Sequence, residues 1–255
     1  PADLYPLVHD NGMVCLNAAT NTYQSLSRTA SNLLQALNES GTPEPLMTFY
    51  ADRYTDYDNR QTLTLAWLEK AATKGLIAWG EAAVPRILPR ARTFTEDEIN
   101  SAGEIVLSFE KVDHLTVSYR EMRSAREALE AAVILAKRPF KEIAAVIAGC
   151  STEDMPSATP EEATRILGSV KQIPPSYALG RVACLERTIA AVLCGAAQNK
   201  RIDMAIGVRL DPNTGHAWPV VDTTAIRLET DPQIAGQYHQ LVCITPGSKI
   251  HRPTY

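Results

Sequence analysis

Hydrophobic positions near the start of the chain follow a strand pattern. Two short apolar runs, Met13–Asn17 and Tyr23–Leu26, lie on either side of small polar residues. The first run also follows the turn-forming residues Asp10-Asn11-Gly12. An apolar run on each side of a polar turn is typical of a β-hairpin.

The pattern then becomes helical. Leucines recur at helical spacing after Ser27 and Thr29, either of which can cap a helix, and Gly41 ends this segment. Apolar positions predict a second helix over about residues 42–54 and a third over 61–74, followed by a short closing strand over 76–79. A hairpin, three helices and a strand predict a winged-helix-like domain over residues 1–83.

Residues 84–114 contain prolines and an acidic stretch without clear periodicity, and they are interpreted as a linker with a short helix. Residues 115–255 form a second domain, in which helices precede strands, so the expected fold class is α+β. Apolar periodicity predicts helices followed by a strand, a turn and a strand: helices over Tyr119–Lys137, Phe140–Ala148, Glu161–Val170 and Ala183–Gly195, and strands over Ile202–Leu210 and from His216 to Val221.

Composition excludes several classes of function. The 255 residues are 45% hydrophobic with a formal net charge of −4, which is ordinary for a globular protein and argues against a nucleic-acid surface. No apolar run approaches the ~20 residues that cross a bilayer, and no signal peptide is recognisable, so a cytoplasmic protein without membrane contact is expected. The sequence contains no phosphate-binding GxxxxGK[ST] motif and no close histidine or cysteine spacing. Neither a cofactor nor a metal is therefore expected.

The five cysteines are scattered, so they indicate neither disulfides nor a zinc site. Cys184 differs from the others because it falls at the start of the predicted helix 183–195. Free N–H groups and the helix dipole there can lower the pKa of a thiol and can stabilise an oxyanion. The same cysteine could also be an unreactive core residue.

His216 begins the strand that follows, and a helix packed on this strand could bring Cys184 to it. The imidazole would then need a carboxylate to orient it, and the hairpin register decides which one. A loop at Thr223-Thr224 places Asp231 opposite His216, whereas a loop at Asp222-Thr223 places Glu229 there. Asp231 is preferred, with Glu229 as the alternative.

These residues resemble a known family. The segments Arg181–Arg187 (RVACLER), Ile206–Arg209 (IGVR) and His216–Trp218 (HAW) are similar to the transglutaminase-like (papain-like) leader peptidases of lasso-peptide biosynthesis, the B proteins. The helical segment Arg126–Ile143 also fits, and His9–Leu37 resembles the leader-recognition element of that family. The likeness covers about four-fifths of the chain.

The chain departs from this family after the histidine motif. The family usually has HAWVEV and then a DG turn, where this chain has Pro219-Val220 and Asp222-Thr223-Thr224. Pro219 cannot donate a ladder hydrogen bond, which predicts an edge or a bulge there. Asp231-Pro232 is similar to the Asp-Pro of transglutaminase-like enzymes, which supports Asp231 as the third residue.

The resemblance implies a cysteine peptidase that removes the leader of a ribosomally made precursor peptide. Cys184 would be the nucleophile, His216 the base and Asp231 the orienting acid, and an ATP-dependent lasso cyclase would be the partner that uses the core. The N-terminal domain would hold the leader as an added β-strand, with walls formed by Tyr23, Leu26, Leu65 and Leu68. A non-catalytic peptide-binding scaffold and acyl transfer to an amine remain the alternatives.

Overall fold

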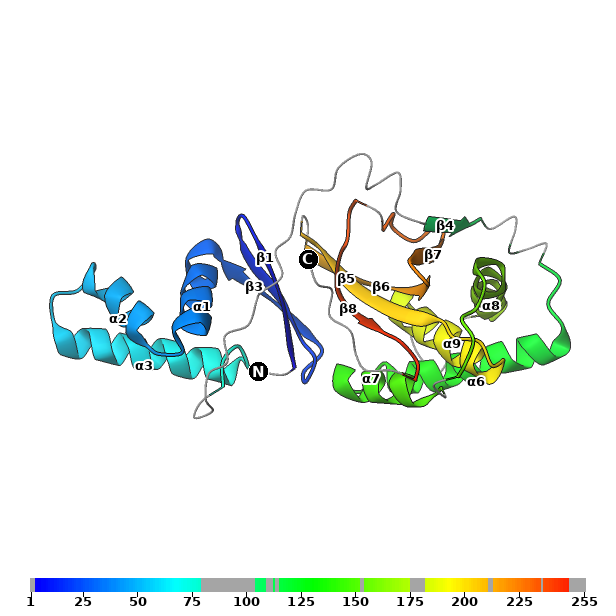
Figure 1. Ribbon diagram of the computed structural model, residues 1–255, viewed down its shortest axis with the longest axis horizontal. Helices are drawn as coiled ribbons and strands as arrows, with labels where there is room; N and C mark the ends of the chain where they lie inside the picture. The colour runs from blue at the N-terminus through cyan, green and yellow to red at the C-terminus, as the bar shows by residue number, and fades with distance from the viewer. Residues whose placement is uncertain are drawn as a thin grey trace. The chain divides into compact units, whose positions relative to one another are not determined.

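The computed structural model describes the chain in two compact units (Figure 1). The residues that it describes are 3–78, 104–108, 112, 115–151, 154–174, 182–210, 213–234 and 236–247. Both units combine helices with a sheet, so the expected α+β class is confirmed. The predicted domain boundary at residue 83 lies outside the described residues.

The first unit begins with a three-stranded antiparallel sheet in the order β1-β2-β3. The strands are β1 (Leu4–His9), β2 (Gly12–Asn17) and β3 (Thr22–Ser27). Strands β2 and β3 are the predicted hairpin, while β1 was not predicted. Pro6 argues against a strand in the sequence because proline cannot donate a ladder hydrogen bond. Strand β1 tolerates this proline because it lies at an edge of the sheet. Strand β2 is buried along its whole length because it is the central strand.

Three helices follow the sheet, as predicted: α1 (Arg28–Ser40), α2 (Glu44–Ala51) and α3 (Tyr57–Thr73). Ser27 caps α1, because its hydroxyl accepts the N–H of Ala30. The predicted closing strand is wrong for residues 76–78, which form no strand, and residue 79 lies outside the described part. The order of elements is therefore three strands and then three helices.

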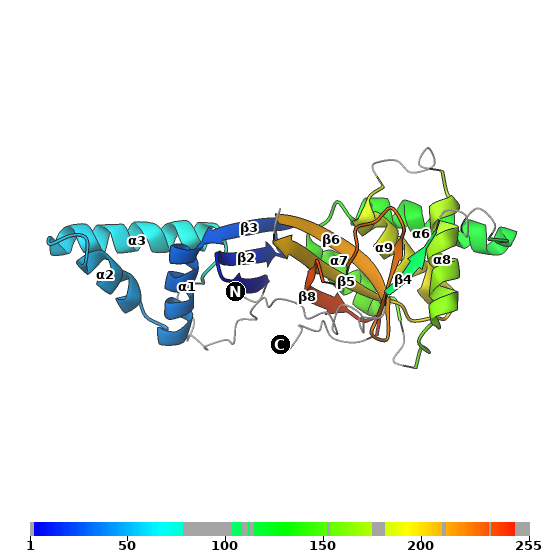
Figure 2. The same cartoon turned by 90° about the horizontal axis from the view of Figure 1, so that it is seen from above.

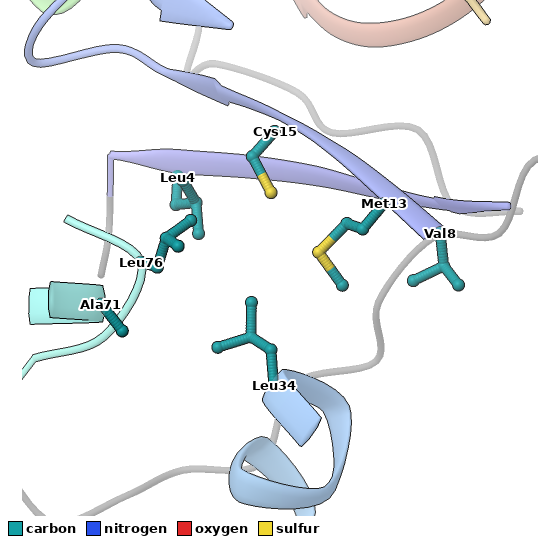
Figure 3. Packing of buried hydrophobic residues seen from close by; sticks show 7 residues of the cluster. All are labelled: Leu4, Val8, Met13, Cys15, Leu34, Ala71 and Leu76. Carbon is teal, nitrogen blue, oxygen red and sulfur yellow. The ribbon is translucent and has the colours of Figure 1, made fainter. Parts of the chain in front are cut away.

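The core of the first unit joins the sheet to the helices (Figure 3). Met13 and Cys15 of β2 face Leu34 of α1 and Ala71 of α3. Burial raises the pKa of the Cys15 thiol to about 12, so this cysteine behaves as a hydrophobic core residue. The sheet is thus covered on this face by helices, while no described strand pairs with the outer edge of β3.

The second unit contains a five-stranded sheet in the order β4-β7-β6-β5-β8. Strands β5, β6, β7 and β8 follow the helices in sequence, and the first strand precedes them. This strand, β4, lies within residues 84–114, and the prediction of a linker is therefore wrong for the residues that form β4. The bounds are β4 (Glu104–Leu107), β5 (Asp203–Leu210), β6 (Asn213–Val221), β7 (Thr224–Leu228) and β8 (His239–Ile244).

Among the described residues, four helices pack against this sheet or against one another (Figures 1 and 2). They are α6 (Tyr119–Leu135), α7 (Phe140–Gly149), α8 (Pro160–Gln172) and α9 (Cys184–Ala197). Helix α9 packs on β5 and β6 and is itself covered by α6 and α8. The four predicted helices and the two strands are confirmed, but β6 begins at Asn213, so the expectation that His216 begins this strand is wrong. The packing of α9 brings its start to the strand that carries His216.

Candidate active site

Helix α9 begins at Cys184 without a side-chain cap at its N-cap residue. That residue is Ala183, which has no side-chain oxygen to accept the N–H groups of the first turn. The Glu186 carboxylate instead accepts the N–H of Ala183 itself, at 2.9 Å. The helix therefore starts with an alanine where serine, threonine or aspartate is usual. The positive end of the helix dipole lies at the thiol.

The thiol of Cys184 lies against the strand that carries His216. The backbone N–H groups of Ala217, which directly follows His216, and of Leu185 act on its sulfur and lower the thiol pKa. Burial nevertheless raises the thiol pKa, and the negative charges of Asp231 and Glu186 add to this rise. The expected lowering of the pKa is therefore wrong for this structure, because loss of solvent outweighs the two N–H donors.

Strand β6 can offer an N–H to the thiol because its pairing with β7 stops early. The paired residues are Val221 with Thr224 and Val220 with Ala225, and the ladder does not continue to Pro219. Alternate residues of a strand direct their N–H groups to the same edge, so Ala217 and Pro219 face the β7 side as Val221 does. Proline has no N–H group to donate. Because β6 and β7 are not paired at Ala217, the N–H group of Ala217 is directed toward Cys184 and not toward a strand partner.

His216 is buried in an aromatic setting. It is 6% exposed, and its ring stacks on Trp218 at 5.9 Å and contacts Tyr238 at 5.3 Å between ring centroids. Burial lowers the pKa of His216, the charge of Asp231 opposes this change, and Arg227 adds to it. A lowered pKa keeps the imidazole neutral at pH 7, which is the form that accepts a proton. Among the described residues, nothing hydrogen-bonds to its buried Nε2 atom.

Asp231 acts on both residues, but the register that predicted it is wrong. The hairpin loop is Asp222-Thr223, since Val221 pairs with Thr224. This is the register that would have placed Glu229 opposite His216. Strand β7 ends at Leu228, however, and the chain then turns, with the Asp231 N–H donating to the Leu228 carbonyl at 3.0 Å. The turn brings Asp231 back toward the site.

Glu229 has a different environment. Its backbone N–H donates to the carbonyl of Leu107 on β4, and its side chain is exposed. Neither the pKa of His216 nor that of Cys184 is affected by its charge, whereas Asp231 affects both. Asp231 therefore fits the third position better than Glu229, through a turn rather than through strand pairing.

Two arginines hold the turn that carries Asp231. Arg227 donates to the backbone carbonyls of Leu228 and Asp231, both at 3.2 Å, and its Nε also bonds to Glu104. Arg187 of α9 reaches the carboxylate itself, with 3.6 Å from Nη1 to Oδ1. Sequence analysis did not assign a role to either arginine, although Arg187 lies within the RVACLER segment.

Gly207 and Tyr238 were also missed. Gly207 is the cross-strand partner of His216, and Tyr238 contacts both His216 and Trp218. Gly207 lies in the IGVR segment, so the sequence held a signal for it. Tyr238 comes from the connection between β7 and β8, and no spacing rule could have linked it to His216.

The residues expected to bind a leader differ in exposure. Tyr23 on β3 is 41% exposed and Leu65 on α3 is 47% exposed, so both are accessible. Leu26 is half-buried and packs against the core of the first unit. Leu68 is 6% exposed within a second core cluster, so its assignment to the wall of a groove is wrong. It faces inward because it belongs to the buried stripe of α3, with Thr64 four residues before it and Ala71 three residues after it.

The other cysteines are poorly placed for catalysis. Cys194 is buried and takes part in hydrogen bonds with Ser124 and Gln198, and burial raises the pKa of Cys243 to about 12. In the described part of the chain, no group of three or more histidine, cysteine, aspartate or glutamate residues could hold a metal ion. None of the helices described there is long and apolar enough to cross a membrane.

Comparison with known proteins agrees with the geometry of the second unit. Residues 122–243 match the family model described as the transglutaminase-like superfamily. No curated protein and no solved structure matches the chain. The matched region includes Cys184, His216 and Asp231 together with the elements that carry them. Residues 122–243 of this chain thus form a transglutaminase-like core domain, a type of domain that suggests cysteine protease or transglutaminase activity.

Proposed function

We propose that this protein is a cysteine peptidase that cuts the leader from a ribosomally made lasso-peptide precursor. The observation that carries the proposal is the packing of α9 on β6, in which the Ala217 N–H acts on the Cys184 thiol, since it brings the start of α9 to the residue after His216. The resemblance of the RVACLER, IGVR and HAW segments to lasso leader peptidases supports the choice of substrate.

The chemistry starts from two neutral groups. Neutral His216 removes the thiol proton as the Cys184 sulfur attacks the scissile carbonyl carbon. The carbonyl oxygen becomes an oxyanion, which the N–H groups at the start of α9 stabilise. When the C–N bond breaks, imidazolium gives its proton to the leaving amine, and the leader stays as a thioester. Water, deprotonated by His216, then hydrolyses the thioester and restores the thiol.

The N-terminal unit would hold the leader. An extended peptide can add to the outer edge of β3, beside Tyr23 and within reach of Leu26, and main-chain hydrogen bonds would supply affinity. Leu65 offers exposed apolar surface on α3. Binding the leader raises the local concentration of the scissile bond, so the catalytic unit needs little affinity of its own. The released core would pass to a separate ATP-dependent cyclase, the proposed partner.

Incubation with the precursor tests this proposal directly. We expect the native protein to yield leader and core, with one water added in total mass, and Cys184→Ala to yield neither while binding the leader as before. Cys194→Ala is the matched control because it removes a buried thiol from the same helix; it should still cleave. Cleavage by Cys184→Ala at the native rate would refute the peptidase proposal.

The raised pKa of Cys184 favours one alternative, a peptide-binding scaffold that does not cleave. A thiol reagent separates the two: faster labelling of Cys184 than of the other four cysteines supports an enzyme, and equal labelling supports a scaffold. Acyl transfer to an amine is distinguished by mass, because the product would contain a new amide instead of a carboxylate.

A further inference from the structure

Arg187 and Asp231 form an ion pair beside the proposed catalytic residues. Arg187 lies three residues after Cys184, on the same helix and close to the same face. Its Nη1 is 3.6 Å from Oδ1 of Asp231, and the two side chains are only 24% and 18% exposed. This pair connects the helix of the nucleophile to the turn that follows β7.

The rest of the Asp231 turn is also held. Oδ2 of the carboxylate accepts the N–H of Leu228 at 3.1 Å, and Arg227 binds the backbone carbonyl of Asp231. In the described structure, Nε2 of His216 has no hydrogen-bond partner, so the carboxylate does not reach that atom. The charge of the carboxylate acts on the imidazole electrostatically, and the strength of that influence depends on where the carboxylate is held.

We propose that Arg187 is a positioning residue that holds the carboxylate of Asp231 beside His216 and ties it to the helix of Cys184. The inference rests on the proposed function for its catalytic meaning, but the ion pair and its effect on the imidazole can be measured without any substrate. Arg187 itself touches no reacting atom in this scheme and acts through Asp231.

Several charged groups face His216 and Asp231, and their charges determine the direction in which the pKa of His216 is expected to change. His216 responds to Asp231 and Arg227, and the guanidinium of Arg209 lies 5.9 Å from the ring of Tyr238, the neighbour of His216. Asp231 itself faces Arg187, the Cys184 thiol and, from α8, Lys171.

Removal of Arg187 can act on His216 in two opposite ways. If it acts by letting the carboxylate drift away, the pKa of His216 falls, because the negative charge that favours imidazolium is lost. If Arg187 acted directly through its own positive charge, its removal would raise that pKa.

Nuclear magnetic resonance titration of His216 in the full chain tests the inference. The resonance is assigned with His216→Gln, and the variants compared are Arg187→Met, Arg187→Lys, Asp231→Asn and the double variant Arg187→Met with Asp231→Asn. We expect Arg187→Met and Asp231→Asn each to shift the pKa of His216 downward. The double variant should shift it no further than Asp231→Asn alone, while Arg187→Lys should leave it near the native value.

An unchanged or raised pKa in Arg187→Met overturns the inference, and so does a double variant whose shifts add, because independent residues give additive effects. Arg187→Gln replaces Arg187→Met if the latter does not fold, as judged by circular dichroism. Native protein that cleaves no precursor would refute the proposed function, but the titration would still decide the role of Arg187. If the proposed function and the role of Arg187 are both correct, Arg187→Met should also move the acid limb of kcat/KM to lower pH.

Discussion

Gly207 and Trp218 are packed so closely that a β-carbon at position 207 would lie 2.6 Å from Cη2 of the indole. It would also lie 2.4 Å from the backbone carbonyl oxygen of His239 on β8. Gly207 pairs with His216 across β5 and β6, so the absent side chain makes room for the ring that stacks on the imidazole. The aromatic setting of His216 thus depends on a glycine from the neighbouring strand.

Gly207→Ala should therefore destabilise the protein by about 1–3 kcal/mol, the usual cost of overpacking. It should also lower cleavage activity, because Trp218 must move away from His216 or β5 must move away from β8. Gly149→Ala is the matched control: its β-carbon would meet nothing within 4 Å, and alanine is the better helix former. Thermal unfolding of the two variants measures the difference, and equal melting temperatures would contradict the prediction.

The pH dependence of cleavage follows from the pKa of His216. Burial moves this pKa below its ordinary value of 6.5, so the imidazole becomes protonated, and loses its function as a base, only below that pH. We expect the acid limb of kcat/KM to have its midpoint below pH 6.5. A midpoint above 6.5 in a pH–rate profile would show that the imidazolium is stabilised instead of destabilised.

The same shift gives a prediction for stability. In the unfolded chain His216 takes up a proton near its ordinary pKa, whereas in the folded protein it does so only at lower pH. Its contribution to stability is therefore complete above pH 6.5 and is lost as the pH falls below that value. Urea unfolding at several pH values should show this loss in the native protein, and a smaller one in His216→Gln. Equal acid sensitivity of the two proteins would argue against it.

Asp231 and Glu229 can be separated by substitution. Asp231→Asn should lower kcat strongly and shift the acid limb to lower pH, because it removes the negative charge that favours imidazolium. Glu229→Gln should leave both unchanged, since that side chain is exposed. Steady-state kinetics of the two variants tests this, and a native profile for Asp231→Asn would remove it from the catalytic group.

Leu65 and Leu68 lie on the same helix but should respond differently to alanine. Leu65 is exposed, so Leu65→Ala should weaken leader binding with a change in stability within about 0.5 kcal/mol. Leu68 is a core residue, so Leu68→Ala should cost about 2–5 kcal/mol of stability. Titration with labelled leader peptide and chemical unfolding measure the two effects. Native affinity in Leu65→Ala would exclude this face of α3 from the binding surface.

Local sequence patterns determined most of the elements of this protein. The helices around Leu34, Leu129 and Ile189 were predictable because each has apolar residues at helical spacing and an identifiable end, and these signals act within one or two turns. Cys184 was also found from local context, since it begins a helix, and His216 was correctly placed on a strand, although β6 begins three residues earlier, at Asn213. Strands β1 and β4 were not predicted from the sequence. Pro6 interrupts the alternation of apolar and polar residues in β1, and acidic residues surround the short apolar run of β4.

Only the tertiary structure decided how the site is assembled. Pro219 breaks the β6–β7 ladder, but only the strand partners show that this leaves the Ala217 N–H for Cys184. Asp231 reaches the site through a turn and an ion pair with Arg187, which no register count could reveal. Burial also reversed the expected pKa of the thiol. The physical reason is common to all of these: desolvation, ion pairing and strand separation depend on residues distant in sequence, whereas periodicity reports only on near neighbours.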